Sequence, residues 1–369
     1  MSTVPPPTGD ELRSAFDAAD PLTIGVEEEL MVLDPETLDL TPAAEELLAL
    51  TGADPRFKRE LPAAQVEIVT PPLRAVPEVA EALAAARRDL VEAAAGRWQF
   101  GGAGVHPFAA AEGVLNDHES YDDTRERYGR VARSQLVFAL QVHVAVGGAE
   151  RTLTVYNALR SYLPEIAALA ANARWYEGRD SEFASVRPKI GEQLPRQGVP
   201  PRIESWDEFA AAMRWGADAD LFEPRAWWWE LRPRAHLGTL EVRVPDAQAT
   251  VAESAGVAAF VHALIAWLVE RHDGGDRLSD HPRWKIEENR WLAARDGVEG
   301  VLVDLDTGER RPARERLLAL LEEIAPCALR VGADLAHARA MVETNGAVRL
   351  RRARDAHAAV RAIAAGFLG

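Results

Sequence analysis

The stretch Ile24-Gly25-Val26-Glu27-Glu28-Glu29-Leu30 places three consecutive carboxylates inside a segment whose other residues are typical of a buried β-strand. Side chains alternate along a strand, so Glu27 and Glu29 share one face and Glu28 points to the other. Carboxylates crowded on one enclosed face raise each other's pKa unless a cation compensates them. The stretch therefore leaves two interpretations open: a divalent-metal site, or a solvated edge strand whose charges prevent further pairing.

The composition of the 369-residue chain, with 47% hydrophobic and 27% charged residues, is that of an ordinary globular protein. A formal net charge of −16 disfavours nucleic acid or an anionic membrane as partner. The single cysteine, Cys327, excludes an internal disulfide and fits a reducing cytoplasm. Because we find neither a signal-peptide core nor an apolar run of about 18 residues, we expect a cytoplasmic protein that does not enter the membrane.

Apolar periodicity predicts an α+β fold. Strand patterns cover 23–33, 64–69, 100–108 and 136–146, and a hairpin is expected from 226–232 and 239–244 around a turn at 233–238. Helices are predicted at 43–50, 77–95, 152–172, 249–271, 283–295, 313–324 and 333–343, with a charged helical or loop segment at 121–133. We expect a mainly antiparallel sheet with helices on one face, forming one domain over residues 21–369 after a flexible tail over residues 1–20.

Four of the predicted strands share one peculiarity, a polar pair two residues apart between apolar neighbours. The pairs are Glu27/Glu29, Gln65/Glu67, Gln141/His143 and Glu241/Arg243. In a single sheet these residues would gather on one face, opposite a face that packs on helices. An ordinary wet sheet face would instead be rich in Lys, Thr and Ser, so the ligand-type residues favour a Mg²⁺-nucleotide site, with the arginine facing a phosphoryl group.

Phosphate recognition in this chain would depend on arginine and metal, because it has three lysines against 39 arginines. There is no GxxxxGK[ST] phosphate loop, and the glycine-rich stretch 101–104 is interpreted as a turn. The irregular segment 177–205 has the length of a binding loop or lid.

Seven segments in the same order resemble the type 2 glutamate-cysteine ligase family, and the chain is most similar to its YbdK-like carboxylate-amine ligases. The segments are GVEEEL (25–30), ELPAAQVEIVT (60–70), GGAGVHPF (101–108), FASVRP (183–188), WWWELRP (227–233), GTLEVRVPD (238–246) and ENRWLAARDG (288–297). The resemblance implies a glutamine-synthetase-like catalytic fold, in which an antiparallel sheet forms an open funnel for ATP and Mg²⁺ or Mn²⁺. It also implies ATP-dependent amide-bond formation between a small-molecule carboxylate and an amine through an acyl phosphate, by a homo-oligomer that we expect to be a dimer.

The resemblance also implies roles for individual residues. Metal ligands would be Glu27, Glu29, Glu67 and Glu241, with Glu60 as a further candidate. Arg243, Glu241 and Arg232 would be catalytic, and the nucleotide would contact Arg243, Arg187, Gln141 and His143. Arg187 and Arg232 each lie next to a proline that restricts the backbone, and either can bind a carboxylate or a phosphate or form a surface ion pair.

The chain departs from the family at Gln141-Val142-His143, where much of the family has His-Val-His. A glutamine carbonyl can still ligate a hard cation or hold substrate. The number of metal ions and the second substrate therefore stay open. Two further functions also stay open: phosphotransfer onto a guanidino or carboxylate acceptor, and nucleotide binding without catalysis.

Other residues have simpler alternatives. His106 is either functional or a capped loop histidine, and Trp227 to Trp229 are interpreted as core and interface aromatics. Cys327, placed between two helical patterns, is interpreted as a buried small residue. Glu28, on the helix-covered face, is expected to pair with an arginine from a covering helix.

Overall fold

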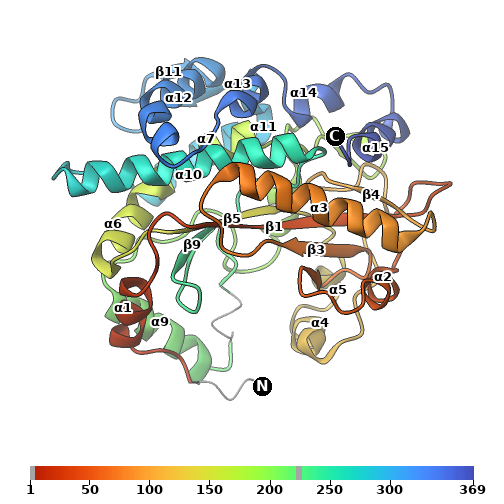
Figure 1. The fold of residues 1–369 in the computed structure, drawn as a ribbon, viewed down its shortest axis with the longest axis horizontal. Helices are drawn as coiled ribbons and strands as arrows, with labels where there is room; N and C mark the ends of the chain where they lie inside the picture. Colours follow the sequence, from red (N-terminus) through yellow and green to blue (C-terminus); the bar gives the residue numbers. More distant parts are fainter. Residues whose placement is uncertain (1–4, 222–226) are drawn as a thin grey trace.

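A central antiparallel sheet organises the computed structural model, which describes residues 5–221 and 227–369 (Figure 1). Its strand order is β2-β3-β1-β5-β9-β8, and β4 pairs with the far end of β1. The strands are β1 (Ile24–Leu33), β2 (Phe57–Arg59), β3 (Gln65–Val69), β4 (Gln99–Gly101), β5 (Leu140–Ala145), β8 (Leu231–Arg234) and β9 (Thr239–Val242). Within the described ranges, β6 (Trp175–Tyr176) with β7 (Arg179–Asp180) and β10 (Val301–Val303) with β11 (Arg310–Pro312) form two small separate sheets.

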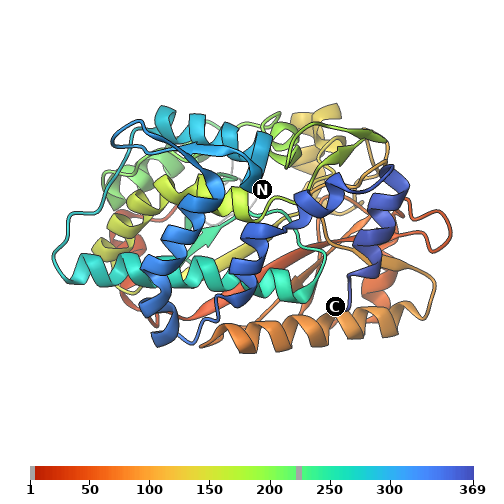
Figure 2. The ribbon, with the colours of Figure 1, turned by 90° about the horizontal axis from the view of Figure 1, so that it is seen from above.

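Helices cover one face of the sheet in two layers (Figures 1 and 2). The inner layer is α3 (Val76–Ala94) and α10 (Val251–Asp273); the outer layer includes α11 (Arg283–Asp296), α12 (Ala313–Arg330) and α13 (Ala336–Glu343). On the other side of the sheet, α1 (Gly9–Asp17) and α9 (Trp206–Asp218) stand at one end and α4 (Asp122–Tyr128) and α5 (Arg130–Arg133) at the other (Figure 1). The remaining α-helices of the described residues are α2 (Ala44–Leu50), α6 (Ala149–Leu159), α7 (Leu163–Leu169), α8 (Arg187–Gly191), α14 (Gly346–Arg351) and α15 (Ala356–Ala365). The expected α+β class is confirmed.

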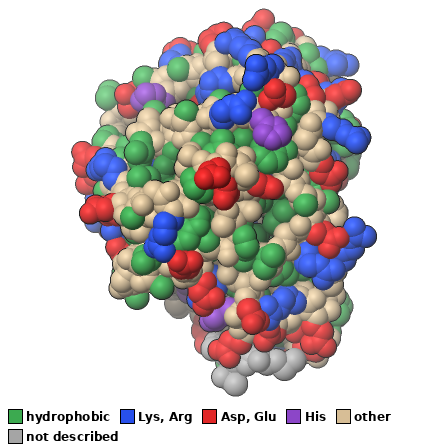
Figure 3. All heavy atoms as spheres, turned by 90° about the vertical axis from the view of Figure 1, so that its right-hand side faces the viewer, with side chains coloured by type: hydrophobic (Ala, Val, Ile, Leu, Met, Phe, Trp, Pro, Cys, Tyr) green, Lys and Arg blue, Asp and Glu red, His purple; other side chains and the backbone are tan. Residues whose placement is uncertain are grey.

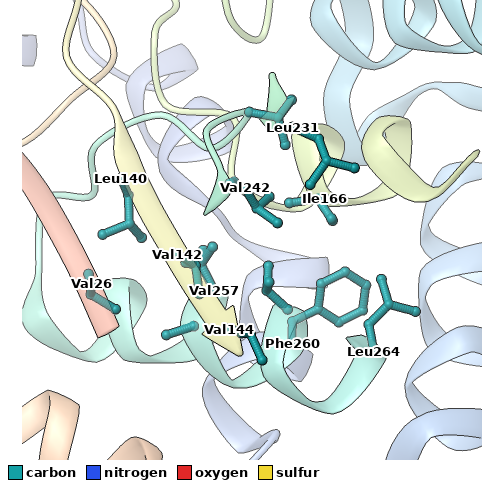
Figure 4. Packing of buried hydrophobic residues seen from close by; sticks show 14 of the residues in the cluster. Val26, Leu140, Val142, Val144, Ile166, Leu231, Val242, Val257, Phe260 and Leu264 are labelled. Atoms are coloured by element: carbon teal, nitrogen blue, oxygen red, sulfur yellow. The ribbon is translucent and has the colours of Figure 1, made fainter. Parts of the chain in front are cut away.

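The hydrophobic core lies between the sheet and α10. Val26, Val142 and Val242 point from β1, β5 and β9 toward Val257 and Phe260 of α10 (Figure 4), and all five are at most 1% exposed. Full burial of such a side chain contributes about 1.5–3 kcal/mol. This apolar face fixes the register of the strands, because a one-residue slip would move every valine to the opposite face.

Glu28 lies on this apolar face, fully buried, and is neutralised as expected by an arginine of a covering helix. Arg87 of α3 donates to both of its carboxylate oxygens, at 2.9 and 2.6 Å. The same guanidinium donates to the carbonyls of Gln248, Ala249 and Phe367. The pair therefore ties β1 to α3, to the segment just before α10 and to the C-terminal segment.

The N-terminal tail expected over residues 1–20 needs correction for residues 9–17, which form α1; residues 1–4 lie outside the described part. Thr8 and Glu11 form a capping box at the start of the helix. Leu12 and Phe16 are buried, and the Phe16 ring stacks on Trp206 of α9 at 4.6 Å. The sequence shows the apolar face of α1 over only two turns. The surface that buries this face is supplied by α9, which lies about 190 residues further along the chain.

Three other boundaries differ from the sequence prediction. The predicted helix 152–172 is interrupted by a 3₁₀ turn at Arg160–Tyr162, just before Pro164, whose missing N–H cannot continue the α-helical ladder. The hairpin turn lies at 235–238, because Pro233 belongs to the terminal strand β8, where a proline is tolerated. The predicted strand 100–108 is reduced to β4, and Ala226 lies outside the described residues.

Cys327 is buried as expected, but it lies inside α12 and not between two helices. The helix continues through Pro326 because Leu320, Ile324 and Cys327 extend the buried stripe at helical spacing. Burial, together with a hydrogen bond to the Glu270 carboxylate, raises the pKa of the thiol to about 11. A thiol with so high a pKa is a poor nucleophile at neutral pH.

Helix α10 qualifies by length and composition as a membrane span, contrary to the expectation that no segment would. Its most apolar window is 89% buried inside the protein, so the apolar surface is used for core packing.

The surface seen in Figure 3 carries acidic and basic side chains interspersed with one another.

Replacing Arg87 by methionine should lower the free energy of unfolding by about 3–5 kcal/mol, because the buried Glu28 carboxylate would lose its counter-charge. Urea unfolding followed by circular dichroism would measure the change. The control is Arg311→Met, since Arg311 pairs with Glu309 on the exposed surface and its loss should change the free energy of unfolding far less than the loss of Arg87. Equal losses in the two variants would contradict a structural role for the Glu28–Arg87 pair.

Candidate active site

The strand register brings the four predicted polar pairs together on the face of the sheet opposite α10. Glu29 lies opposite Glu67 on β3, and Glu27 lies opposite Gln141 on β5. His143 in turn lies opposite Glu241 on β9. Paired residues in an antiparallel sheet point to the same side, so one continuous polar surface crosses four strands.

One half of this surface is acidic, and its charge is only partly compensated. Burial raises the pKa of Glu29 and Glu67, and the neighbouring carboxylates raise the pKa of Glu67 further. Burial and the charge of Glu29 raise the pKa of Glu60, in the loop before β3, to about 8. Lys58, opposite Glu67 on β2, is a nearby cation but only a partial counterweight. This half has the charge pattern of a site that receives a cation.

The other half is a cluster of arginines around one buried carboxylate. Arg232 donates to both oxygens of Glu241, at 2.6 and 3.1 Å, and Arg243 and Arg234 approach the same carboxylate. Burial alone would raise the pKa of Glu241, but Arg232 and Arg243 outweigh it and hold that pKa well below the ordinary value. Burial lowers the pKa of Arg232 to about 10, which still leaves it protonated at neutral pH. Three guanidinium groups around one carboxylate leave this half with excess positive charge.

Gln141 joins the two halves. Its amide nitrogen donates to Glu29 at 2.7 Å, and its carbonyl oxygen accepts from Arg243. A backbone N–H, that of Ala139, donates to the second oxygen of Glu29 at 2.6 Å. The amide group of Gln141 therefore fixes the position of Glu29, a candidate metal ligand, relative to Arg243, a candidate catalytic residue.

A potential metal-binding group lies where the halves meet. Ligand atoms of Glu27, His143 and Glu241 all fall within 4.8 Å of one another. His143 Nδ1 is 3.0 Å from the hydroxyl of Thr239, while its buried Nε2 has no hydrogen-bond partner among the described residues and lies 3.5 Å from Glu27. Such an unpartnered ring nitrogen facing carboxylates is suited to a cation.

Arg187 lies beside this surface but is held by the protein itself. Its guanidinium donates to Asp246 and to the backbone carbonyls of residues 243–245. Arg232, by contrast, faces Glu241 directly. Neither arginine forms the surface ion pair that was the simpler alternative, since both are largely buried.

Two residues of the glycine-rich segment serve packing. His106 is a capped loop histidine, because its Nδ1 accepts from the N–H groups of Phe108 and Ala109 while its Nε2 meets the carbonyl of Leu38. The glycines permit close approach and do not form the predicted turn: a Cβ on Gly102 would lie 2.1 Å from the Gln248 carbonyl oxygen. Of the three tryptophans, Trp227 belongs to the core.

Several site residues were not identified from the sequence. Arg234 and Thr239 extend the polar face on β8 and β9, and an i±2 count from Arg232 and Glu241 finds both. The Tyr121 hydroxyl donates to the carbonyl of Arg59 at 2.9 Å, next to Glu60, and burial, Glu60 and Glu67 raise its pKa. Tyr121 and Asp246 have no strand periodicity, because Tyr121 ends a 3₁₀ turn and Asp246 lies after β9.

A hollow lies away from this polar surface. It is a cavity of about 700 Å³ between residues 35–38 and α15, and none of the charged residues of the polar sheet face lines it. Its lining combines three charged or titratable side chains, Glu36, His357 and Arg361, with polar and apolar ones. The convergent chemistry is therefore on the sheet face and not in this cavity.

Comparison with known proteins shows the family to which the chain belongs. The model of glutamate-cysteine ligase family 2 matches residues 23–365, a range that contains every site residue named above. The chain belongs to glutamate-cysteine ligase family 2. A Rubrobacter xylanophilus protein with the provisional name glutamate–cysteine ligase 2-3 is 38% identical over 331 residues, covering 88% of this chain and 89% of that protein. A Mycobacterium avium protein with the provisional name glutamate–cysteine ligase 2 is 33% identical, covering 97% and 96%.

Solved structures show the same fold at low sequence identity. The glutamate–cysteine ligase of Francisella tularensis, solved in complex with AMP, superposes with a TM-score of 0.68 at 12% identity, covering 96% of this chain and 90% of that one. A bifunctional glutathione synthetase from Pasteurella multocida gives a TM-score of 0.64 at 15% identity, covering 97% of this chain and 53% of that one. The family member described here thus has the ligase fold that its sequence predicted.

The acidic half should make stability depend on pH and on divalent metal. A raised pKa such as that of Glu60 means that the folded state binds the proton more tightly than the unfolded state, whose pKa is about 4.3. This contribution to stability is complete below about pH 4.3 and is lost as pH rises toward about 8. Without metal, the thermal midpoint should fall by several degrees between about pH 6 and about pH 8, and Mg²⁺ should restore it most at the higher pH.

Differential scanning fluorimetry with chelator or with Mg²⁺ would measure this effect. The variant Glu60→Gln should flatten the pH dependence, whereas Glu81→Gln, on the exposed surface of α3, should not. A midpoint that rises with pH in the absence of metal would show that the carboxylates are not held protonated.

Proposed function

We propose that residues 21–369 act as one ATP-dependent carboxylate-amine ligase domain with glutamate-cysteine ligase-like activity. The observation that carries the proposal is the division of one sheet face into a cation-deficient acidic half and an arginine-rich half, joined by Gln141. A nucleoside triphosphate with its metal needs both kinds of surface. The family membership and the relatives' names support a ligase, and the AMP in a structure of the same fold supports ATP as the nucleotide.

The proposed reaction has two steps. An oxygen of the substrate carboxylate attacks the γ-phosphorus of ATP, the bond to the β-γ bridging oxygen breaks, and ADP leaves with an acyl phosphate in place. The amine nitrogen then attacks the acyl carbon, loses a proton and expels inorganic phosphate. Arg243 donates through Nη1 to Glu241 and Gln141. Its guanidinium would face the negative charge that develops during the transfer. Arg232 would hold the Glu241 carboxylate in place.

The side chains fit a resident Mg²⁺ or Mn²⁺. Glu29, Glu60 and Glu67 have raised pKa values that a bound cation would reverse, and Glu27 with His143 supplies a carboxylate beside an unpartnered ring nitrogen. Glu241 is the least available of the proposed ligands, because arginines already occupy both of its oxygens. When bound, the metal would neutralise phosphate oxygens and orient the triphosphate.

The proposed setting is the cytoplasm, with small-molecule carboxylate and amine substrates and a dimeric assembly. The single free cysteine supports a reducing compartment. Segment 177–205 supplies Arg187 and borders the site, so we place part of the substrate pocket there.

A coupled assay tests the activity. Purified protein with Mg²⁺, ATP, glutamate and a panel of amines and amino acids should release ADP and phosphate and form an amide that mass spectrometry detects. Hydroxylamine should trap the acyl phosphate as a hydroxamate. A stable phosphorylated product without amide would instead favour phosphotransfer, and stabilisation by ATP without hydrolysis would favour a non-catalytic relative.

Replacing Glu67 by glutamine should separate stability from activity. The variant removes a buried carboxylate that its neighbours repel, so the metal-free protein should unfold at the same or a higher temperature than the wild type. Turnover should fall by about 100-fold or more, because a proposed metal ligand is lost. Calorimetry and the assay above measure the two effects, with Glu81→Gln as control. Loss of both folding and activity would indicate a structural role.

A further inference from the structure

Arg187 was expected to bind the nucleotide, but its contacts indicate a different task. Its Nε donates to Asp246 at 2.7 Å, and its Nη2 donates to the carbonyls of Arg243, Val244 and Pro245 at 3.3, 2.6 and 3.0 Å. Four acceptors from one short segment therefore surround one guanidinium whose side chain is 13% exposed. This is the contact pattern of an arginine that shapes a backbone.

Asp246 is the fixed point of the arrangement. It is 2% exposed and accepts from the backbone N–H of Asn172 at 2.7 Å and from the hydroxyl of Ser185 at 3.0 Å, in addition to Arg187. Gly104 packs so closely against it that a Cβ there would lie 2.6 Å from the carboxylate carbon. A buried carboxylate held by three donors and enclosed by backbone has little freedom to move.

The clamped segment leads directly to both halves of the candidate site. Arg243 is its first residue, and the N–H of Arg243 is itself held by the carbonyl of Glu230 at 2.8 Å. Pro245 accepts from the N–H of Leu140, and Asp246 bridges to Ala139, whose N–H holds the Glu29 carboxylate. The position of Arg243 relative to Glu29 therefore depends on where residues 243–246 lie.

We propose that Arg187 and Asp246 form a positioning clamp that sets Arg243 against the acidic half and does not itself bind the nucleotide. The role in catalysis rests on the function proposed above, whereas the clamp as a structural unit does not. Since misplacing a catalytic group by about 1 Å can cost about 100-fold in rate, weakening the clamp should reduce turnover without removing any group that touches substrate.

The test combines exchange and kinetics. In Asp246→Asn and Arg187→Lys, hydrogen exchange measured by mass spectrometry should increase in the peptide that contains residues 243–247. In the same variants kcat should fall by about 10–100-fold, with the KM for ATP changed by less than about threefold, because Arg243 acts on charge that develops during transfer. Ser185→Ala, which removes only the hydroxyl bond to Asp246, is the milder variant and should shift both readouts in the same direction.

A double-mutant cycle distinguishes positioning from direct binding. If the clamp acts through Arg243, Asp246→Asn should cost almost nothing further in kcat/KM once Arg243→Ala is present. Independent, additive losses would overturn the proposal, as would a KM for ATP raised at least about tenfold with unchanged kcat in Arg187→Lys, which would make Arg187 a direct ligand.

The matched control is the pair formed by Arg160 and Asp280. Arg160 is also buried and likewise holds an aspartate, at 2.9 Å, and a backbone carbonyl, that of Pro200, at 3.0 Å. Arg160→Lys should lower stability while leaving kcat and exchange at residues 243–247 unchanged. If the wild type neither forms an amide nor binds a non-hydrolysable ATP analogue, the proposed function fails. Hydrogen exchange still tests the clamp in that case. Unchanged exchange at residues 243–247 in both Asp246→Asn and Arg187→Lys would overturn it.

Discussion

The alternation of side chains along β1 is the constraint on which the rest of the structure depends. Three consecutive carboxylates cannot share one face of a strand, so Glu28 enters the core while Glu27 and Glu29 face the candidate site. The negative charge must be neutralised separately in the core and on the site face. In the core, Arg87 neutralises Glu28 and at the same time binds the backbone at residues 248, 249 and 367. On the other face compensation is incomplete, which is why that face is suited to a cation.

The candidate site consequently has two halves of opposite charge, one rich in carboxylates and one rich in arginine. Burial and neighbouring carboxylates raise the pKa of Glu67 in the acidic half, whereas Arg232 and Arg243 keep Glu241 ionised in the other half, which retains excess positive charge. Gln141 holds the halves together through a neutral amide, which adds no charge to either. A surface of this kind complements a ligand that is itself both cationic and anionic, and the ligand proposed above, a metal-bound triphosphate, is of that kind.

Periodicity was sufficient to predict much of this arrangement. The polar pairs on β1, β3, β5 and β9 were placed on one face by an i±2 count, and the register confirmed that they meet. The same count could not find α1 as a packed helix, because its apolar side needs Trp206 from a distant helix. Nor could it show that Pro233 lies within a strand, since that depends on β8 being the last strand of the sheet.

The sequence by itself determined the class of fold, the face on which each glutamate lies and the kind of chemistry that such residues support. Each of these follows from the alternation of polar and apolar side chains along a strand, which can be counted directly in the sequence. Only the tertiary structure decided what each charged group contacts. Arg187 and Arg243 are both arginines in matched motifs, yet one is enclosed by carbonyls of residues 243–245 and the other meets Glu241. The difference arises because a guanidinium binds whichever acceptors the fold brings to it. Arg187 meets acceptors more than 50 residues further along the chain, whereas Arg243 meets both its near neighbour Glu241 and the distant Gln141.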